Sequence, residues 1–224
     1  MFSAQADFGK GIGRIFNFCS TCHLFKGRNM ILKLLAAFIV FSASALEFSE
    51  SFTVGGSDAV LKNWQIECGN WKLTEEGLNG TSGGGDGLIF YKNQQFRNFV
   101  MECNVRVENR EGSLVFRASD KQNLYLLVFN PKTDKDSQGS VLVVRRVNGK
   151  ETYFAGTELK IPRKEWIKLK VVCEDSNIQI YVNDKFTLSV DDENLKTGAV
   201  GLRVYGDFLN GCNASFKDFS VKPK

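Results

Sequence analysis

Apolar and polar residues alternate along much of the chain, which is the pattern of strands with one buried face. The segment 99–107 (FVMECNVRV) is the clearest case, because Glu102, Asn104 and Arg106 fall on one side and apolar residues on the other. Alternation or short apolar runs predict seven further strands, at 113–119, 124–130, 141–147, 166–174, 178–182, 199–206 and 215–221. No long amphipathic helix is predicted, and at most one helical turn is expected near Glu193.

Turn signals separate these segments at the spacing typical of an all-β sandwich. Glu111-Gly112, Asn148-Gly149 and the residues 175–177 stand between consecutive predicted strands. No linker or change in composition divides residues 46–224. We therefore expect one all-β domain over 46–224, built as an antiparallel sandwich of two sheets.

A secretory signal peptide is predicted at residues 30–45 (MILKLLAAFIVFSASA). Lys33 gives the charged start, an apolar run follows, and Ala43-Ser44-Ala45 supplies the small side chains that a signal peptidase requires, so we expect cleavage after Ala45. The apolar run is shorter than the roughly 20 residues that a membrane-spanning helix needs. We expect a secreted, extracellular, monomeric domain without a membrane anchor, preceded by a leader over residues 1–45.

The start of the leader allows three interpretations. Met30 is the true start, or the signal has a long basic n-region, or residues 1–29 are a mitochondrial transit peptide, for which the segment is poor in Ser and Arg. Cys19, Cys22 and His23 match the C-x-x-C-H pattern of covalent haem attachment. Because this motif precedes the cleavage site and lacks a cytochrome-like context, we interpret it as a chance match.

The net charge of +4 by itself suggests a nucleic-acid partner, but the position of the charges along the chain does not support one. Residues 1–45 carry five Lys and Arg against one Asp, whereas the rest of the chain carries 24 of each sign. The basic excess therefore belongs to the leader, and nucleic acid is not an expected partner. The only histidine, His23, also lies in the leader, which excludes Ser-His-Asp catalysis and histidine metal sites from 46–224.

Two kinds of covalent feature are expected in a secreted domain. Four cysteines remain after cleavage, and their even number predicts two disulfides of undetermined pairing, with buried free thiols as the alternative. They are Cys68, Cys103, Cys173 and Cys212. Asn79-Gly80-Thr81 and Asn213-Ala214-Ser215 are sequons for N-glycosylation in turn-like contexts.

Strand alternation also shows which polar side chains share a face. On 199–206, Arg203 and Tyr205 oppose Leu202 and Val204. A sheet face that carries Arg, Asn and Tyr side chains suits a sugar, which needs ring stacking and paired hydrogen bonds. We select Asn104, Arg106, Arg117 and Tyr125 as candidate glycan contacts. An ordinary solvated sheet face is the alternative.

The order of these motifs resembles the concanavalin A-like lectin/glucanase superfamily over nearly all of 48–221. The resemblance is closest to 3-keto-disaccharide hydrolase domains, with laminin G-like domains near them. It rests on residues 64–78 (WQIECGNWKLTEEGL), 97–107, 112–119, 165–184 and the closing GAVGLRVYG and ASFKDFSV segments. The resemblance implies a jelly-roll sandwich whose concave sheet carries any ligand site.

The resemblance also implies what to look for in an active site. Glucanase relatives place their carboxylates in an E-x-D-x-x-E strand, and the corresponding strand here, YLLVFN (125–130), has no carboxylate. Glu102 is then a lone candidate. Structural calcium in the superfamily uses an Asp of the last strand, and Asp218 is at the resembling position. No other cofactor is expected.

We conclude from the sequence that the domain is a secreted, non-catalytic, lectin-like module that binds glycan on its concave sheet. Two alternatives stay open: a glycoside (3-keto-disaccharide) hydrolase-like enzyme, and a laminin G-like adhesion module whose ligand is an extracellular protein.

Overall fold

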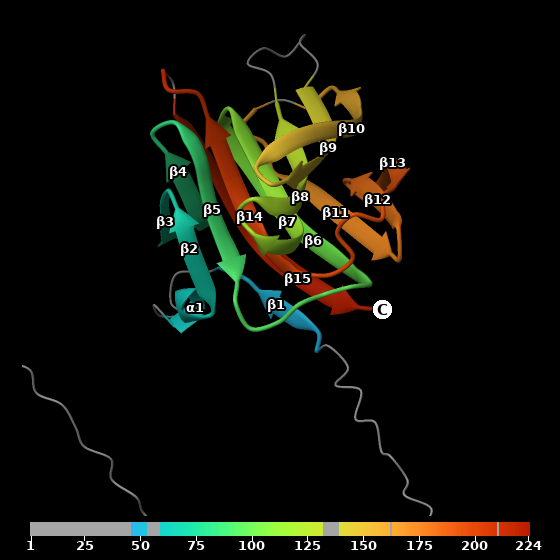
Figure 1. Ribbon diagram of the computed structural model, residues 1–224. Coiled ribbons are helices and arrows are strands. Elements are labelled where there is room, and N and C mark those ends of the chain that lie inside the picture. The colour runs from blue at the N-terminus through green and yellow to red at the C-terminus, as the bar shows by residue number, and fades with distance from the viewer. Residues whose placement is uncertain (1–45, 53–58, 132–138, 162, 210) are drawn as a thin grey trace, which may run out of the picture. The chain divides into compact units, whose positions relative to one another are not determined.

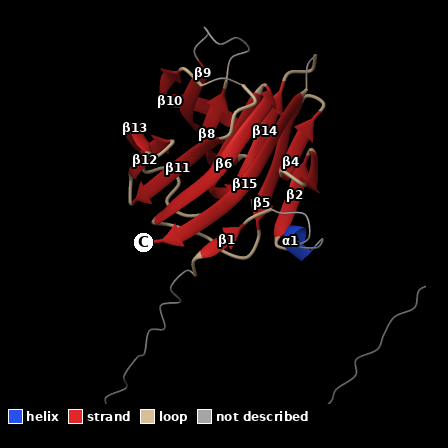
Figure 2. Ribbon diagram, turned by 180° about the vertical axis from the view of Figure 1, so that it is seen from behind, coloured by secondary structure: helices blue, strands red, loops and turns tan. Residues whose placement is uncertain are grey.

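The computed structural model describes residues 46–224 except 53–58, 132–138, 162 and 210. The predicted signal peptide and the Cys19-Cys22-His23 motif lie outside the described residues. Figures 1 and 2 show the described part from opposite sides as two layers of antiparallel strands. This confirms the predicted all-β sandwich of two sheets.

Sheet A has eight strands and sheet B has seven. In spatial order, sheet A contains β13 (Lys185–Asp191), β12 (Asn177–Val182), β11 (Ile167–Glu174), β6 (Phe99–Asn109), β15 (Cys212–Pro223), β4 (Gly77–Ser82) and β3 (Asn70–Thr74), with β1 (Phe48–Glu50) also paired to β15. Sheet B contains β10 (Lys150–Leu159), β9 (Gly139–Val147), β8 (Asn123–Asn130), β7 (Glu111–Asp120), β14 (Ala199–Gly206), β5 (Gly85–Tyr91) and β2 (Trp64–Cys68).

All eight predicted strands form, with bounds that differ by a few residues at most ends. The pattern missed β10 and β13, whose side chains are largely exposed or half-buried, so that neither carries a clear apolar face. It also missed β4 and β5, where glycines interrupt the alternation, and the short strands β1, β2 and β3. The helical turn expected near Glu193 is absent, and within the described residues the helical turn α1 lies at Ala59–Lys62 instead.

Two hairpins turn at residues with positive φ, as tight hairpin turns require. Asn148 and Gly149 have φ values of 50° and 77° between β9 and β10. Asn183 and Asp184 have φ values of 48° and 63° between β12 and β13. These turns fix the registers of both hairpins and therefore which side chains face the core.

The main core lies between the two sheets. Met101, Val105 and Phe216 from sheet A and Leu114 and Phe116 from sheet B are fully buried in it. At one end, aromatic rings of both sheets meet, with Trp64 and Phe219 edge to face at 5.3 Å. This continuous core holds both sheets in place, so the backbone positions from which the outer side chains project are set.

Sheet B is strongly curled. Its strands β9 and β5 are four places apart in the sheet, which is about 19 Å in a flat sheet. Nevertheless Nη1 of Arg146 on β9 lies 2.7 Å from Oδ2 of Asp86 on β5. Arg203 on β14 and Glu151 on β10, also four places apart, approach to 3.7 Å. Only a sheet curled toward its outer face brings these pairs together, so the outer face of sheet B is concave.

The curl encloses a second, smaller apolar core on that concave face. Leu88, Val115, Leu124, Leu126 and Val144 are at least 99% buried there, apart from the core between the sheets. Burial on both faces explains why β8 is a nearly continuous apolar run. Among the described residues, no helix has the length and apolar character needed to cross a membrane.

Candidate functional site

Five charged residues gather where the concave face of sheet B closes. We call them the concave cluster: Asp86, Glu111, Arg146, Glu151 and Arg203. They come from five strands, β5, β7, β9, β10 and β14 respectively. Alternation aims each of them at the outer side of sheet B, and the curl then brings them into contact.

Arg203 is the most buried member of the concave cluster, at 3% exposure. Its Nε donates to Oδ1 of Asp86 at 2.6 Å, and its Nη1 donates to Oε2 of Glu111 at 3.5 Å. The ring of Tyr205 lies 4.5 Å from its guanidinium carbon. The register places Arg203 directly opposite Ser113, whose buried hydroxyl oxygen has no hydrogen-bond partner among the described residues.

Arg146 joins the cluster from β9, next to the edge strand β10. Its Nη1 donates to Asp86 at 2.7 Å and to the carbonyl oxygen of Lys121 at 3.1 Å. Its Nε and Nη2 both donate to Oε1 of Glu151, at 3.2 and 2.6 Å. Two arginines and three carboxylates therefore form one hydrogen-bonded network with fixed side-chain positions.

The carboxyl groups of the cluster differ in acidity. Burial alone would raise the pKa of Asp86, but the charges of Arg203 and Arg146 and the hydrogen bonds they donate outweigh it, so this pKa is lowered. Burial raises the pKa of Glu111, and Arg203 offsets this only in part. The network thus holds one strongly ionised carboxylate beside one that takes up a proton more readily.

Two tyrosines stand at the rim of the concave cluster. Tyr153 on β10 is 66% exposed and Tyr205 on β14 is 38% exposed. Tyr153 shares a face of β10 with Glu151, two residues before it, and burial and the nearby charges of Glu151 and Glu111 raise the pKa of its hydroxyl. Exposed aromatic rings next to fixed hydrogen-bonding groups form a surface that suits a polyhydroxylated ring.

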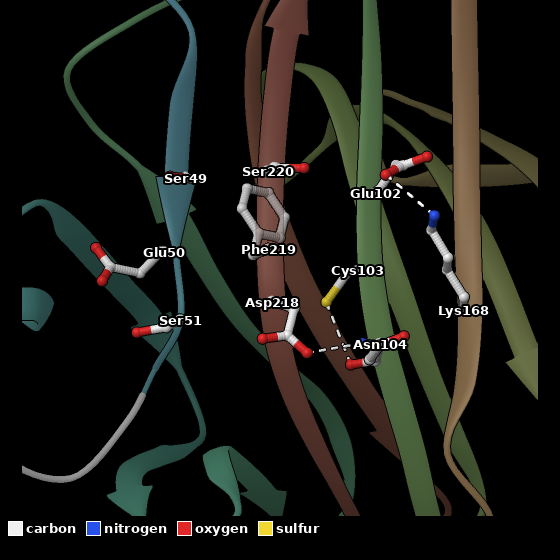
Figure 3. Close-up of a pocket in the computed structure, with 10 residues that line it drawn as sticks. All are labelled: Ser49, Glu50, Ser51, Glu102, Cys103, Asn104, Lys168, Asp218, Phe219 and Ser220. Carbon is white, nitrogen blue, oxygen red and sulfur yellow. Dashed lines mark hydrogen bonds and ion pairs between the residues drawn. The ribbon is translucent and has the colours of Figure 1, made fainter.

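Two of the four predicted glycan contacts lie on the other sheet. Asn104 and Arg106 project from β6 on the outer face of sheet A, where Asn104 donates to Asp218 at 2.7 Å. Arg106 is paired with Glu76 and Glu108, and its guanidinium lies 5.1 Å from the ring centre of Trp166. Figure 3 shows Asn104 and Asp218 in a pocket of this face.

The other two predicted contacts are buried, and we correct their roles. Arg117 is 0% exposed and donates to the backbone carbonyls of Arg97, Asp175 and Leu195. Tyr125 is also 0% exposed, within the core between the sheets, and its hydroxyl donates to Asp192. Both side chains stabilise the fold, and neither reaches a surface that a glycan can contact.

The remaining predicted site residues also lie on sheet A. Glu102, the catalytic candidate, is paired with Lys168 at 3.3 Å and Lys170 at 3.1 Å, and it faces away from the concave cluster. Asp218, the calcium candidate, is hydrogen-bonded to Asn104 within a β-bulge of β15. In the described part of the chain, no group of three or more His, Cys, Asp or Glu residues could hold a metal ion.

The four cysteines are free thiols, so the two predicted disulfides are not formed. Cys173 on β11 lies opposite Phe99 on β6. Cys103 is four residues further along β6, so it lies about 13 Å from the position opposite Cys173. A disulfide needs Cα atoms within about 7 Å. Burial raises the pKa of all four thiols, that of Cys173 to about 12 and that of Cys212 to about 11. The structure thus has the alternative of free thiols, of which those of Cys103, Cys173 and Cys212 are buried and that of Cys68 is half-buried.

The two sequon asparagines are neighbours in space. Asn79 on β4 pairs with Ser215 on β15, and its Nδ2 donates to Oδ1 of Asn213 at 2.7 Å. Both lie on strands of sheet A rather than in the turns that the sequence suggested. Glycosylation at either position stays a prediction, and the contact makes simultaneous modification of both crowded.

The sequence did not predict that the five residues of the concave cluster meet, because the alternation of apolar and polar residues does not indicate how strongly a sheet curls. The usable signal was charge at interior positions of strongly apolar strands, as in Arg146 within VLVVRRV and Arg203 within AVGLRVYG. Alternation correctly placed Arg203 and Tyr205 opposite Leu202 and Val204. It could not show that strands four places apart bring their side chains together.

The stacked antiparallel sheets define a jelly-roll sandwich of the concanavalin A-like class, as the sequence predicted. Known proteins with this architecture include a prokaryotic β-1,3-1,4-glucanase (lichenase) derived from a mouse hindgut metagenome, with a TM-score of 0.60 and 11% identity over 80% of this chain and 99% of that one. Within this class, the chain belongs to the family of 3-keto-alpha-glucoside-1,2-lyase-like domains, whose model matches residues 52–222.

Two proteins of Bacillus subtilis resemble the chain in sequence. The carbohydrate binding module CBM66 has a TM-score of 0.63 and 25% identity over 71% of this chain and 95% of the module. A levanase of strain 168 is 26% identical over 150 residues, which are 65% of this chain and 21% of the levanase. The chain thus spans about a fifth of the length of that enzyme.

Proposed function

We propose that this domain is a carbohydrate-binding module that holds a glycan over the concave cluster of sheet B. The observation that carries the proposal is the network of Arg203, Arg146, Asp86, Glu111 and Glu151 beneath two exposed tyrosines. The buried arginines hold the partly exposed carboxylates of Asp86, Glu111 and Glu151 in place, the oxygens of these carboxylates can accept hydrogen bonds from sugar hydroxyls, and the tyrosine rings offer stacking faces. The similarity to a carbohydrate binding module supports the same interpretation.

A glycan array tests the proposal first, with levan and its oligosaccharides included because of the similarity to a levanase. Tyr153→Ala then tests the site. Tyr153 is 66% exposed, so its removal leaves the core intact, and we expect binding to weaken about tenfold or more. Phe186→Ala is the matched control, because Phe186 is 61% exposed but lies on sheet A. Equal effects of the two variants would contradict the assignment.

Catalysis is the second candidate function, and the acidity difference between Asp86 and Glu111 favours it. A carboxyl with a raised pKa beside an ionised carboxylate is the arrangement that glycosidic cleavage uses. The assay is release of product from 3-keto and ordinary disaccharides. Activity that Glu111→Gln abolishes and Glu102→Gln leaves unchanged would establish an enzyme. Glycan binding without turnover supports the binding module.

We also propose that the domain acts outside the cell, on the basis of the signal sequence at 30–45. The intact mass of the secreted protein tests this directly. A chain that begins at Leu46 is expected, and a chain that retains residues 30–45 would contradict it.

A further inference from the structure

A second hollow lies beside the concave cluster. It is a cavity of about 420 Å³ whose floor includes the buried ring of Phe90 and the small side chains of Ala118 and Ala199. Phe90 pairs with Gly201 on β14, and a Cβ on Gly201 would stand 2.9 Å from the Phe90 ring. The small residues Ala118 and Ala199 therefore leave space open beside the Phe90 ring.

The walls of this cavity are rich in amide side chains. Gln65 from β2, Gln95 from the segment between β5 and β6, and Gln122 from the turn between β7 and β8 all line it. Each amide offers a donor and an acceptor side by side, which matches two adjacent hydroxyls. Charges of both signs, Glu67 and Lys121 among them, also line the cavity. The lining thus favours a neutral polyhydroxylated ligand over an ion of either sign.

The cavity and the concave cluster share a contact. Arg146 donates through Nη1 both to Asp86 in the cluster and to the carbonyl oxygen of Lys121, which lines the cavity. Along β5, Phe90 lies four residues beyond Asp86, which is about 13 Å. That separation exceeds one sugar ring, so a single monosaccharide cannot occupy both places.

We propose that the cavity over Phe90 is a second sugar subsite, and that the ligand of this domain is an oligosaccharide that spans the cavity and the concave cluster. This inference rests on the proposed glycan-binding function and adds the length of the ligand to it. Affinity then depends on chain length, because only a chain reaches both places.

The experiment is calorimetric titration of the protein over residues 46–224 with fructose and with levan oligosaccharides separated by length. We expect affinity to rise with length and then level off. The double variant of Gln65→Ala and Gln95→Ala removes two exposed amides, and we expect it to weaken binding of the longest oligosaccharide about tenfold while leaving fructose binding unchanged. Gln179→Ala on sheet A is the control.

Four results would overturn the inference. If affinity is independent of length, or if the double variant binds the longest oligosaccharide like the wild type, the cavity is not a subsite although the proposed function stands. If the double variant weakens fructose and oligosaccharide equally, the amides act on the cluster and not on a second subsite. If the wild type binds neither these sugars nor any glycan of the array, the proposed function itself fails.

Discussion

Replacement of Arg117 by methionine should destabilise the domain severely without affecting the concave cluster directly. The guanidinium is 0% exposed and donates four hydrogen bonds to three backbone carbonyls. Nε and Nη2 reach the oxygen of Arg97 at 3.2 and 2.8 Å, Nη2 reaches Asp175 at 2.7 Å, and Nη1 reaches Leu195 at 3.3 Å. These carbonyls belong to three separate connections, which the arginine holds together.

The magnitude follows from what the methionine leaves behind. Its apolar stem fills much of the space, but three carbonyl oxygens lose their donor, at roughly 1–3 kcal/mol for each buried group left unsatisfied. Partial entry of water relieves some of this cost, so we expect a loss of about 3–5 kcal/mol in the free energy of unfolding. That is a large share of the roughly 5–15 kcal/mol that holds a typical domain folded.

The assay is urea unfolding followed by tryptophan fluorescence, with the midpoint and slope compared among variants. Arg97→Met is the matched control, because the side chain of Arg97 is 66% exposed and its ion pair with Asp175 at 3.4 Å should contribute less than about 1 kcal/mol. A loss of less than about 1 kcal/mol for Arg117→Met would refute the reasoning. A folded Arg117→Met protein with specifically lost glycan binding would instead restore Arg117 as a ligand contact.

Two further predictions concern acidity and thiols. Since the folded pKa of Asp86 is lowered, its stabilising contribution is present above its unfolded pKa of about 3.9 and is lost as pH falls through the lower folded value. Asp86→Asn should cost about 2 kcal/mol at pH 7 and flatten the acid limb of stability against pH, and parallel curves for both proteins would contradict this. Thiol titration with peptide mapping should find Cys103 and Cys173 unreactive in the native protein and all four cysteines of 46–224 reactive after denaturation without reductant. Thiols that appear only after reduction would show disulfides.

Much of the sandwich could be predicted because strands bury alternate residues. The alternation in β6 and β11 gave both their existence and their buried faces, including those of Cys103 and Cys173. Strands without a clear apolar face, such as β10, could not be predicted from alternation. β10 nevertheless carries Glu151 and Tyr153 of the candidate site. Gly149 marked the turn before β10 but not the strand that follows.

The candidate site was harder to predict for a physical reason. Alternation assigns a side chain to a face but not to a curvature, so it could not bring Arg146 and Asp86 together. Nor could it distinguish a polar residue facing solvent from one covered by connecting segments. Arg117 is such a residue, because the carbonyls that surround it come from positions 20 to 78 residues away in the chain.

The most direct test of glycan binding on sheet B is amide chemical-shift mapping by NMR during titration with a glycan that binds on the array. Binding at the concave cluster predicts shift changes centred on Asp86, Glu111, Glu151 and Arg203. Changes confined to the outer face of sheet A, around Asn104, would contradict the account, as would an array on which no glycan binds.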